Sequence, residues 1–213
     1  MKAALAAEDL SFSYDEGAPL LDSWSAAFDN GEMVAITGPS GRGKSTLLYL
    51  LGLMLAPQAG AVRLEGQDVT GLSDRHRAAL RAHRFGFVFQ DAALDPSRTV
   101  LDNVLETVLY RGGDRRAEEA RARSLLADLG VAVRAEARPG QVSGGQAQRI
   151  ALCRALLGRP SVVLADEPTG NLDPATSEVV LDAFRRHAHD GAVVVVVTHE
   201  PAVVLACDRE IPL

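Results

Sequence analysis

Eight consecutive residues, GPSGRGKS from Gly38 to Ser45, have the types and the spacing that could hold a phosphate group. Their glycines allow positive φ and close approach, so successive N–H groups can point inward and form an anion-binding nest. Lys44 is one of only two lysines in a chain that otherwise uses arginine. A compact ammonium can reach between two phosphates as a point charge, whereas a planar guanidinium is wider. The pattern therefore predicts that Lys44 binds phosphate and that the Ser45 hydroxyl binds Mg²⁺.

The flanking residues supply the strand and the helix that such a loop needs. Glu32 to Thr37 is a short apolar run suited to a buried strand, and Thr46 to Leu55 consists mostly of helix-forming residues. A helix that begins at the end of the loop adds its free N–H groups to the phosphate site. The alternative is a chance glycine-rich turn, and the strand, loop and helix context of a P-loop argues against it.

A pair of carboxylates follows another apolar run later in the chain. Asp166 and Glu167 come directly after Val162 to Ala165, which predicts a buried strand with two acidic side chains at its carboxyl end. We expect Asp166 to hold Mg²⁺ directly or through water, and Glu167 to accept the proton of the attacking water or to orient that water. An acidic strand end that only caps the next turn is the alternative, and it would be preferred for an isolated pair.

A second candidate anion site lies at Val142 to Gln146, which opens a helix with apolar residues. Ser143 is expected at its N-cap, where free N–H groups and the helix dipole favour an anion. The first loop already cradles one nucleotide, so the role of a second phosphate-facing helix start needs an explanation. A second copy of the chain could supply this helix end in trans.

The remaining pattern predicts the elements that position these groups. Strands are expected near residues 4–12, 24–28, 32–37, 61–64, 85–89, 161–165 and 192–197, and helices over about 143–156 and 174–189. Continuous β-branched runs that alternate with helices indicate a parallel sheet covered on both faces, with ligands at the carboxyl ends of its strands. Thr37, Asp166 and Thr198 would lie together at that edge. Between Gln90 and the later strands, helical spacing predicts a helical insert over roughly 91–158.

Composition limits the classes of partner. The chain has 213 residues, a formal charge of −6, and arginines scattered among carboxylates, which argues against nucleic acid as its main partner. Residues 111–123 are arginine-rich but also acidic, and we interpret them as a solvated helix face. The longest apolar stretches are well short of the roughly 20 residues that cross a bilayer, and the N-terminus lacks a signal-peptide core, so we expect a cytoplasmic protein.

Three other side chains are expected to be structural. Trp24 is interpreted as a core residue and not as a ligand. Cys153 and Cys207 are far apart and lack a CxxC spacing. Both are therefore expected to be reduced, buried and apolar in character.

With these motifs in order, the chain resembles an ATP-binding cassette (ABC) ATPase along essentially its whole length. Gly38 to Ser45 matches the family's Walker A motif, Val162 to Glu167 its Walker B motif and Val142 to Gln146 its signature motif. The other matches are Gln90 to the Q-loop glutamine, Asn171-Leu172-Asp173 to the D-loop, His199 to the switch histidine and Tyr14 to the aromatic residue that stacks on adenine. Val142 stands where the family usually has Leu, and Arg42 where a small residue is commoner; neither change removes a phosphate contact.

The resemblance implies an α/β P-loop NTPase in one domain over residues 1–213. Its parts would be a RecA-like parallel sheet core, an N-terminal antiparallel β lobe (both within about 1–90 and 159–213) and an inserted α-helical subdomain (about 91–158). The cofactors implied are ATP and Mg²⁺. Nucleotide contacts are expected from Tyr14, Gly38, Pro39, Ser40, Gly41, Arg42, Gly43, Lys44, Ser45, Thr46, Ser143, Gly144, Gly145, Gln146 and Asp173. Metal contacts are expected from Ser45, Gln90 and Asp166, and catalytic roles from Glu167, His199 and Gln90.

Some of these assignments have structural alternatives. Tyr14 beside Phe12 could be a core residue, Gln90 an exposed strand cap, and His199 an ordinary helix-start residue before Pro201. The position of His199 beyond an apolar strand favours a hydrogen bond to the γ-phosphate.

The family's mechanism predicts a head-to-tail homodimer with ATP held between the Walker loop of one protomer and residues 143–146 of the other. Hydrolysis would then separate the two protomers. An integral-membrane permease subunit would dock on a groove formed by residues 91–104, and the protein would lie on the inner face of the cell membrane. Within the family, the compact length of the chain and residues 170–173 resemble the macrolide-export, lipoprotein-release and cell-division group. The alternative function is a regulatory ATPase that controls an extracytoplasmic enzyme through a membrane partner, without transported cargo.

Overall fold

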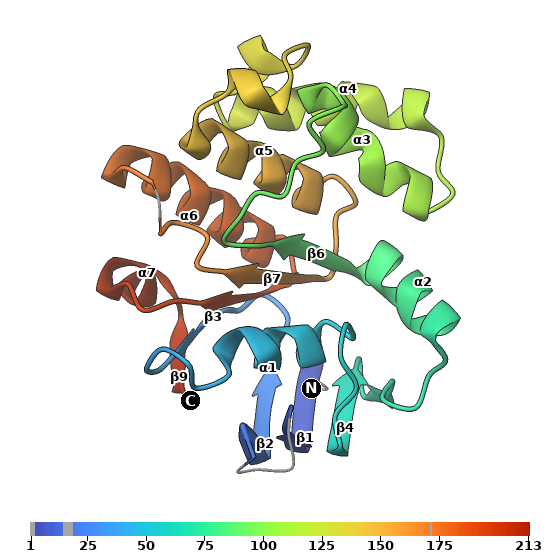
Figure 1. Cartoon of the computed structure of the whole chain (residues 1–213), viewed down its shortest axis with the longest axis vertical. Helices are drawn as coiled ribbons and strands as arrows, with labels where there is room; N and C mark the ends of the chain where they lie inside the picture. Colours follow the sequence, from blue (N-terminus) through green and yellow to red (C-terminus); the bar gives the residue numbers. More distant parts are fainter. Residues whose placement is uncertain (1–2, 15–18, 171) are drawn as a thin grey trace.

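The computed structural model describes residues 3–14, 19–170 and 172–213. Asn171, part of the predicted D-loop, lies outside the described residues. Two sheets and a group of helices succeed one another along the longest axis of the molecule (Figure 1).

A parallel sheet forms the centre. Its strands are β3 (Met33–Thr37), β6 (Phe85–Val88), β7 (Val162–Asp166), β8 (Val193–Val197) and β9 (Arg209–Pro212). They are arranged in the order β6-β7-β8-β3-β9, and every neighbouring pair is parallel. All residues of β7 and β8 are buried, as expected for a sheet that is covered on both faces.

An antiparallel sheet lies beside it, toward the N-terminal part of the chain. Its strands are β1 (Leu5–Phe12), β2 (Leu21–Phe28), β4 (Ala59–Leu64) and β5 (Gln67–Asp68), in the order β2-β1-β4-β5. Helix α1 (Lys44–Leu51) lies between the two sheets and contacts β1, β7 and β8 (Figure 1). Leu47, Leu48, Leu50 and Leu51 are fully buried, so α1 is apolar around most of its circumference and fixes the loop that precedes it.

Helices cover the other face of the parallel sheet. They are α3 (Val100–Tyr110), α4 (Arg115–Asp128), α5 (Gly144–Leu156), α6 (Pro174–His189) and α7 (Pro201–Ala206), with 3₁₀ turns at Ala132–Arg134 and Pro139–Gln141. Helix α2 (Asp74–Arg84) leads directly into β6. A second apolar core joins α3, α4, α5 and α6 to this face of the sheet. Helices α3 to α5 lie at the far end of the molecule from the antiparallel sheet (Figure 1).

The structure confirms the predicted fold class and most of the predicted elements. The helix from Pro174 to His189 has the predicted bounds. Helix α1 ends earlier than predicted, because Gly52 caps it and Leu53 takes a left-handed φ of 59°. Helix α2 and strand β9 were not predicted: α2 has no buried residue, and β9 is short and largely exposed, so neither carries an apolar pattern.

The predicted structural roles of individual residues are confirmed except at Cys207, which was predicted to be buried and is only half-buried. Trp24 is half-buried and packs against the core that surrounds α1. Both cysteines are free; Cys153 is buried and Cys207 is half-buried. On α4, within the range 111–123 interpreted as a solvated helix face, Glu119 and Arg123 form an ion pair at 2.9 Å. In the described part of the chain, no helix combines the length and the apolar character that crossing a membrane requires.

Candidate active site

The predicted phosphate loop connects β3 to α1, and its glycines are required by geometry. Gly38, Gly41 and Gly43 all have positive φ, at 147°, 78° and 89°. A Cβ on Gly38 would lie 2.7 Å from the carbonyl oxygen of Leu213, and a Cβ on Gly43 would lie 2.7 Å from the side chain of Leu20. Gly41 has open space around it. The loop can therefore take this path only with glycine at these positions.

Lys44 is bound to its own loop. Its Nζ donates hydrogen bonds to the carbonyl oxygens of Gly38 at 2.7 Å and Pro39 at 3.0 Å. These bonds hold the ammonium over the loop, where it can exchange the two carbonyls for phosphate oxygens. The Arg42 side chain, in contrast, is exposed to solvent.

Asp166 ends β7 beside the loop. Its side chain is 8% exposed, and burial raises the pKa of its carboxyl group, as does the charge of Glu167. A hydrogen bond from Ser45 and the charge of Lys44 act on this pKa in the opposite direction. A hydroxyl and a carboxylate that meet in this way are the oxygen ligands that Mg²⁺ prefers, so these residues fit the predicted metal.

The next residue, Glu167, is constrained in both its backbone and its side chain. Its φ is 45°, a left-handed value that costs a non-glycine residue on the order of 1–3 kcal/mol. Its Oε1 lies 2.6 Å from Nδ1 of His199, and its Oε2 accepts a hydrogen bond of 3.3 Å from Thr198 Oγ1. The hydrogen bond and the charge of Glu167 raise the pKa of the exposed His199 imidazole. Two predicted catalytic residues are thus in direct contact.

The third predicted catalytic residue, Gln90, lines a cavity together with the same carboxylate. Gln90, Gly144 and Glu167 all line one cavity between the end of β6, the start of α5 and the end of β7. No residue from Gly38 to Thr46 lines it. Glu167 therefore lies at this cavity, while its neighbour Asp166 bonds to the phosphate loop.

The predicted signature motif forms the start of α5. Ser143 Oγ accepts a hydrogen bond of 3.3 Å from the Gln146 amide, and Gln146 Oε1 accepts one of 2.9 Å from the Ser143 amide. This capping box confirms the predicted N-cap. Gly144 is exposed, and a Cβ there would meet no atom within 4 Å, so this helix end is open to a ligand or to another protein.

Asp173 and Tyr14 have contacts within the chain. Asp173 Oδ1 accepts a hydrogen bond from the Thr176 amide at 3.0 Å and Oδ2 one from Thr176 Oγ1 at 2.7 Å, so it caps α6, and these bonds lower its pKa. Tyr14 is 65% exposed, with its ring edge-on to Phe12 and its hydroxyl 3.1 Å from Thr46 Oγ1. The structure places Tyr14 beside the loop, while the nucleotide contacts of Tyr14 and Asp173 stay predictions.

Two residues of α5 near the site were not predicted. Gln148 is 7% exposed and donates a hydrogen bond of 3.0 Å from Nε2 to the carbonyl oxygen of Phe89. Arg154 donates hydrogen bonds to the carbonyl oxygens of Ala92 and Ala93, each at 2.9 Å. The available signal was a polar residue among the apolar residues of a predicted helix, which by itself does not identify a partner.

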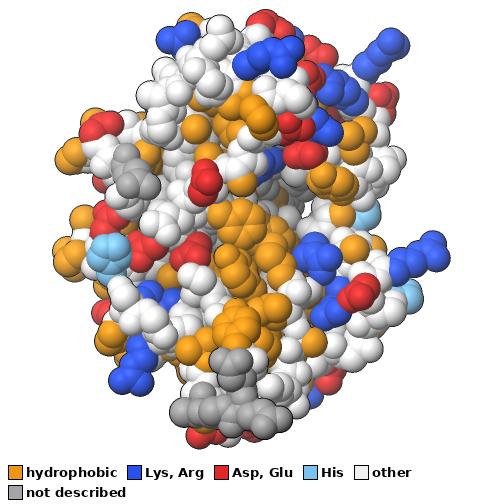
Figure 2. Space-filling view, viewed as in Figure 1, with side chains coloured by type: hydrophobic (Ala, Val, Ile, Leu, Met, Phe, Trp, Pro, Cys, Tyr) orange, Lys and Arg blue, Asp and Glu red, His pale blue; other side chains and the backbone are white. Residues whose placement is uncertain are grey.

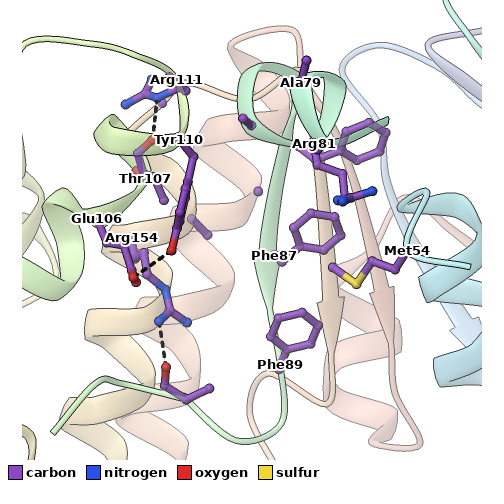
Figure 3. Close-up of a pocket in the computed structure, with 17 residues that line it drawn as sticks. Met54, Ala79, Arg81, Phe87, Phe89, Glu106, Thr107, Tyr110, Arg111 and Arg154 are labelled. Carbon is purple, nitrogen blue, oxygen red and sulfur yellow. Dashed lines mark hydrogen bonds between the residues drawn. The ribbon is translucent and has the colours of Figure 1, made fainter. Parts of the chain in front are cut away.

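An aromatic groove opens next to this region, between α2 and α3. Figure 3 shows Phe87, Phe89 and Met54 on one side of it, with Tyr110 and Arg154 on the other. A band of hydrophobic side chains occupies the hollow between the upper helices and the antiparallel sheet (Figure 2). Of the range 91–104 that was predicted to form a docking groove, only Ala93 lines this one.

Comparisons with known proteins agree with this geometry. Residues 21–170 match the family model described as ABC transporter. The chain is 45% identical over 212 residues to the lipoprotein-releasing system ATP-binding protein LolD of Bordetella pertussis, covering 98% of this chain and 92% of that protein. It is 44% identical over 197 residues to the macrolide export ATP-binding/permease protein MacB of Syntrophobacter fumaroxidans, covering 91% of this chain and 27% of that protein.

Solved structures agree as well. A dimeric structure of MJ0796, a bacterial ABC transporter cassette, superimposes with a TM-score of 0.91 at 34% identity, covering 98% of this chain and 94% of that chain. A dimeric post-hydrolysis state of MJ0796 bound to ADP and Pi gives a TM-score of 0.89 at 33% identity, with the same coverage. The chain therefore belongs to the ABC transporter family, as an ATP-binding domain with ATPase activity.

Proposed function

We propose that this chain energises a membrane transporter of the lipoprotein-release or export type by ATP-driven pairing of two copies. The observation that supports it most directly is the continuous set of contacts from Ser45 to Asp166 and from Glu167 to His199 beside the phosphate loop. Such a set can connect the metal and the γ-phosphate to the group that handles the attacking water.

The roles of the residues follow from their positions. The amides of Gly38 to Thr46 would hold the phosphates, and Lys44 would exchange two carbonyl oxygens for β- and γ-phosphate oxygens. Ser45, Asp166 and Gln90 would hold Mg²⁺, which when bound neutralises charge on the phosphate oxygens. Glu167 would accept the proton of the attacking water or orient that water. His199 would orient Glu167 and donate a hydrogen bond to the γ-phosphate.

Two copies would complete each site. Within one chain the start of α5 shares a cavity with Glu167 but not with the phosphate loop. The open helix end at Ser143 to Gln146 is therefore available to the nucleotide of a second copy, and the similar MJ0796 cassette is dimeric. Loss of the γ-phosphate would remove contacts from both protomers and let them separate, which is the movement that does work.

The membrane partner would dock on the aromatic groove and adjoining parts of residues 91–104. The groove has an apolar aromatic floor and the arginines 81, 111 and 154 at its edges, against one acidic residue, Glu106. This composition suits an amphipathic segment with an acidic residue, presented by an integral-membrane permease subunit at the cytoplasmic face of the membrane. The relatives named for lipoprotein release and macrolide export support this class of system.

A regulatory ATPase that controls an extracytoplasmic enzyme is the second candidate, because its site would be identical. Copurification of the membrane partner separates the two: a partner with a cargo pathway supports transport, and one bound to a periplasmic or cell-wall hydrolase supports regulation.

The Glu167→Gln variant tests the catalytic assignment. The amide keeps the shape of the side chain but cannot accept a proton, so ATP hydrolysis should fall by about 10²–10⁴-fold while ATP binding persists. ATP should then produce a stable dimer in gel filtration. Glu119→Gln is the matched control, because Glu119 pairs with Arg123 on α4 and does not line the cavity that contains Glu167. This variant should retain normal turnover. A Glu167→Gln chain that stays monomeric with ATP and turns over at the wild-type rate would refute the assignment.

A further inference from the structure

The segment that carries Gln90 is held by side chains of α5 on both sides of that residue. Gln148 bonds to the carbonyl oxygen of Phe89, one residue before Gln90. Arg154 bonds to the carbonyl oxygens of Ala92 and Ala93, two and three residues after it. Only Gln90 and Asp91 lie between these points, and both are exposed. Helix α5 therefore grips the backbone around Gln90 while leaving its side chain free to line the cavity with Glu167.

The bonds to Phe89 and Ala92 are partly buried, whereas the bond from Arg154 to Ala93 is exposed. Gln148 is 7% exposed, and burial lowers the pKa of the Arg154 guanidinium. A planar guanidinium presents two parallel donors, which fit two successive carbonyl groups better than one ammonium can. Removal of Gln148 would leave the carbonyl oxygen of Phe89 without this partner, and removal of Arg154 would do the same for that of buried Ala92.

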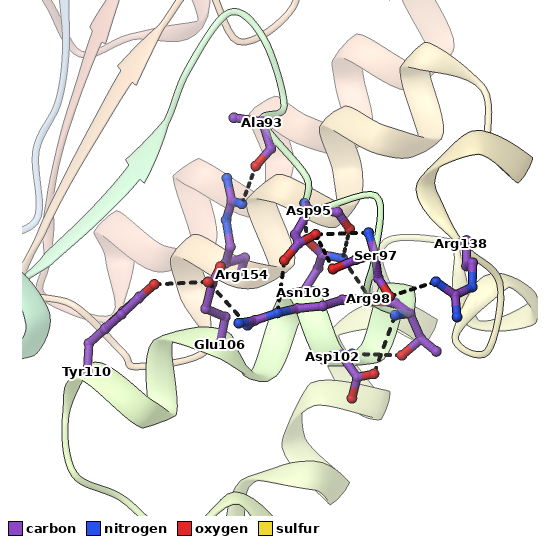
Figure 4. Close-up of polar contacts among 11 residues, drawn as sticks. Ala93, Asp95, Ser97, Arg98, Asp102, Asn103, Glu106, Tyr110, Arg138 and Arg154 are labelled. Carbon is purple, nitrogen blue, oxygen red and sulfur yellow. Dashed lines mark hydrogen bonds and ion pairs between the residues drawn. The ribbon is translucent and has the colours of Figure 1, made fainter.

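The rest of the segment is attached to the helices as well (Figure 4). Asn103, which is fully buried in α3, accepts a hydrogen bond of 2.7 Å from the Asp95 amide and donates one of 3.1 Å to the Asp95 carbonyl oxygen. Arg98 pairs with Glu106 at 3.2 Å, and Tyr110 donates to the same carboxylate at 2.9 Å. The backbone from residue 92 to 98 is thus part of the helical body, and the Gln90–Asp91 pair is the short connection between that body and β6.

We infer that Gln148 and Arg154 are positioning residues, which set the distance between Gln90 and the catalytic carboxylate of Glu167 through the backbone of residues 89–93. The inference rests on the proposed role of Gln90. Neither residue contacts the nucleotide in this scheme. Both residues lie on α5, whose first turn is the signature motif. The same helix would therefore contact the nucleotide of the second copy and set the position of Gln90 in its own chain. Arg154 also lines the aromatic groove, so a partner docked in the groove would contact one of the two side chains that hold residues 89–93.

The first test compares two arginines of matched chemistry. Arg154→Ala and Arg154→Lys should each lower kcat for ATP by about 10-fold or more, with little change in KM, because ATP binding by the phosphate loop is intact. Arg121 is the control: on α4 it likewise bonds two successive carbonyl oxygens, of Leu157 at 2.9 Å and Leu156 at 3.3 Å, and burial likewise lowers its pKa. Arg121→Ala should retain the wild-type kcat. If Arg154→Ala does not fold, Gln148→Ala is a second, independent variant in which the same fall in kcat is expected.

A double-mutant cycle with Gln90 separates positioning from general destabilisation. If Arg154 acts through Gln90, its substitution should add little to the loss already caused by Gln90→Ala. Wild-type kcat in Gln90→Ala would remove the proposed role of Gln90 and, with it, the positioning role of Gln148 and Arg154. Two results would overturn the positioning role of Gln148 and Arg154 while leaving the role of Gln90 intact. In the first, Gln90→Ala is impaired but Arg154→Lys and Gln148→Ala keep the wild-type kcat. In the second, the losses caused by the Gln90 and Arg154 substitutions are fully additive.

Discussion

The carboxyl end of β7 shows how adjacent carboxylates obtain different surroundings. Asp166 points into a buried position where Ser45 and Lys44 are close, whereas the left-handed φ of Glu167 directs the next side chain to Thr198 and His199. A regular strand would alternate these side chains across the sheet. Asp166, proposed to bind the metal, and Glu167, proposed to accept the proton, therefore have separate partners although they are adjacent in the chain, and the unusual backbone angle lies at the second of them.

The contact between His199 and Glu167 predicts a measurable titration. The pKa of His199 is raised above its ordinary value of about 6.5 by the hydrogen bond and charge of Glu167. The contribution of the raised His199 pKa to stability is therefore fully present below the unfolded-state pKa of about 6.5, and it is lost as pH rises through the raised pKa. Histidine NMR titration should show this pKa return toward about 6.5 in Glu167→Gln. An unchanged value in the variant would mean that another group causes the shift.

At the scale of elements, β6 and α5 approach each other without an intervening side chain. A Cβ on Gly86 would lie 2.7 Å from the backbone carbonyl oxygen of Ala155 and 2.9 Å from the Pro160 ring. This close approach brings Gln148 within reach of the backbone at Phe89. The glycine is needed here for space, since its φ is not among the positive values.

Gly86→Ala should therefore destabilise the protein by about 1–3 kcal/mol, since the added methyl group forces helix and strand apart. Gly71→Ala is the control, because a Cβ at Gly71 would meet no atom within 4 Å and its φ is not positive. Urea unfolding of the two variants should show a clear loss for Gly86→Ala and at most a small change for Gly71→Ala. Equal stabilities would show that the helix can move aside at no cost.

For the whole molecule, the important feature is that α1 is enclosed by both sheets. The helix that begins at the phosphate loop contacts β1 on one side and β7 and β8 on the other. The buried leucines of α1 belong to the apolar core that also contains residues of β1, β7 and β8, so a ligand held at the N-terminus of α1 is connected to that core. Nucleotide binding should accordingly stabilise the folded chain as a unit.

Thermal unfolding can measure this linkage. At 100 times its dissociation constant, a ligand that binds only the folded state adds about 2.7 kcal/mol. For a chain of this size that corresponds to a rise in Tm of roughly 5–10 °C with Mg-ATP. The Lys44→Ala variant should lose most of this rise in Tm at the same ATP concentration. It lacks the ammonium group that would exchange its two loop carbonyl partners for phosphate oxygens. A full shift in the variant would contradict the binding role of Lys44.

The sequence by itself determined the parts of the protein that depend on neighbouring residues. The phosphate loop, the Asp166–Glu167 pair and the capped helix start at Ser143 are each contiguous, and their strand or helix context is visible in the adjacent apolar pattern. Parallel strands also place their carboxyl ends at one edge, so the proximity of the strand ends at Thr37, Asp166 and Thr198 could be predicted before any coordinates.

Tertiary structure decided the contacts between residues that are distant in the chain. The bonds of Gln148 and Arg154 to residues 89–93 join positions about sixty residues apart, and no local pattern specifies such a pair. The same holds for the aromatic groove, whose walls come from α2, β6, α3 and α5. Local preferences act over a few residues, whereas packing of helix against strand selects which distant side chains can satisfy a buried carbonyl group.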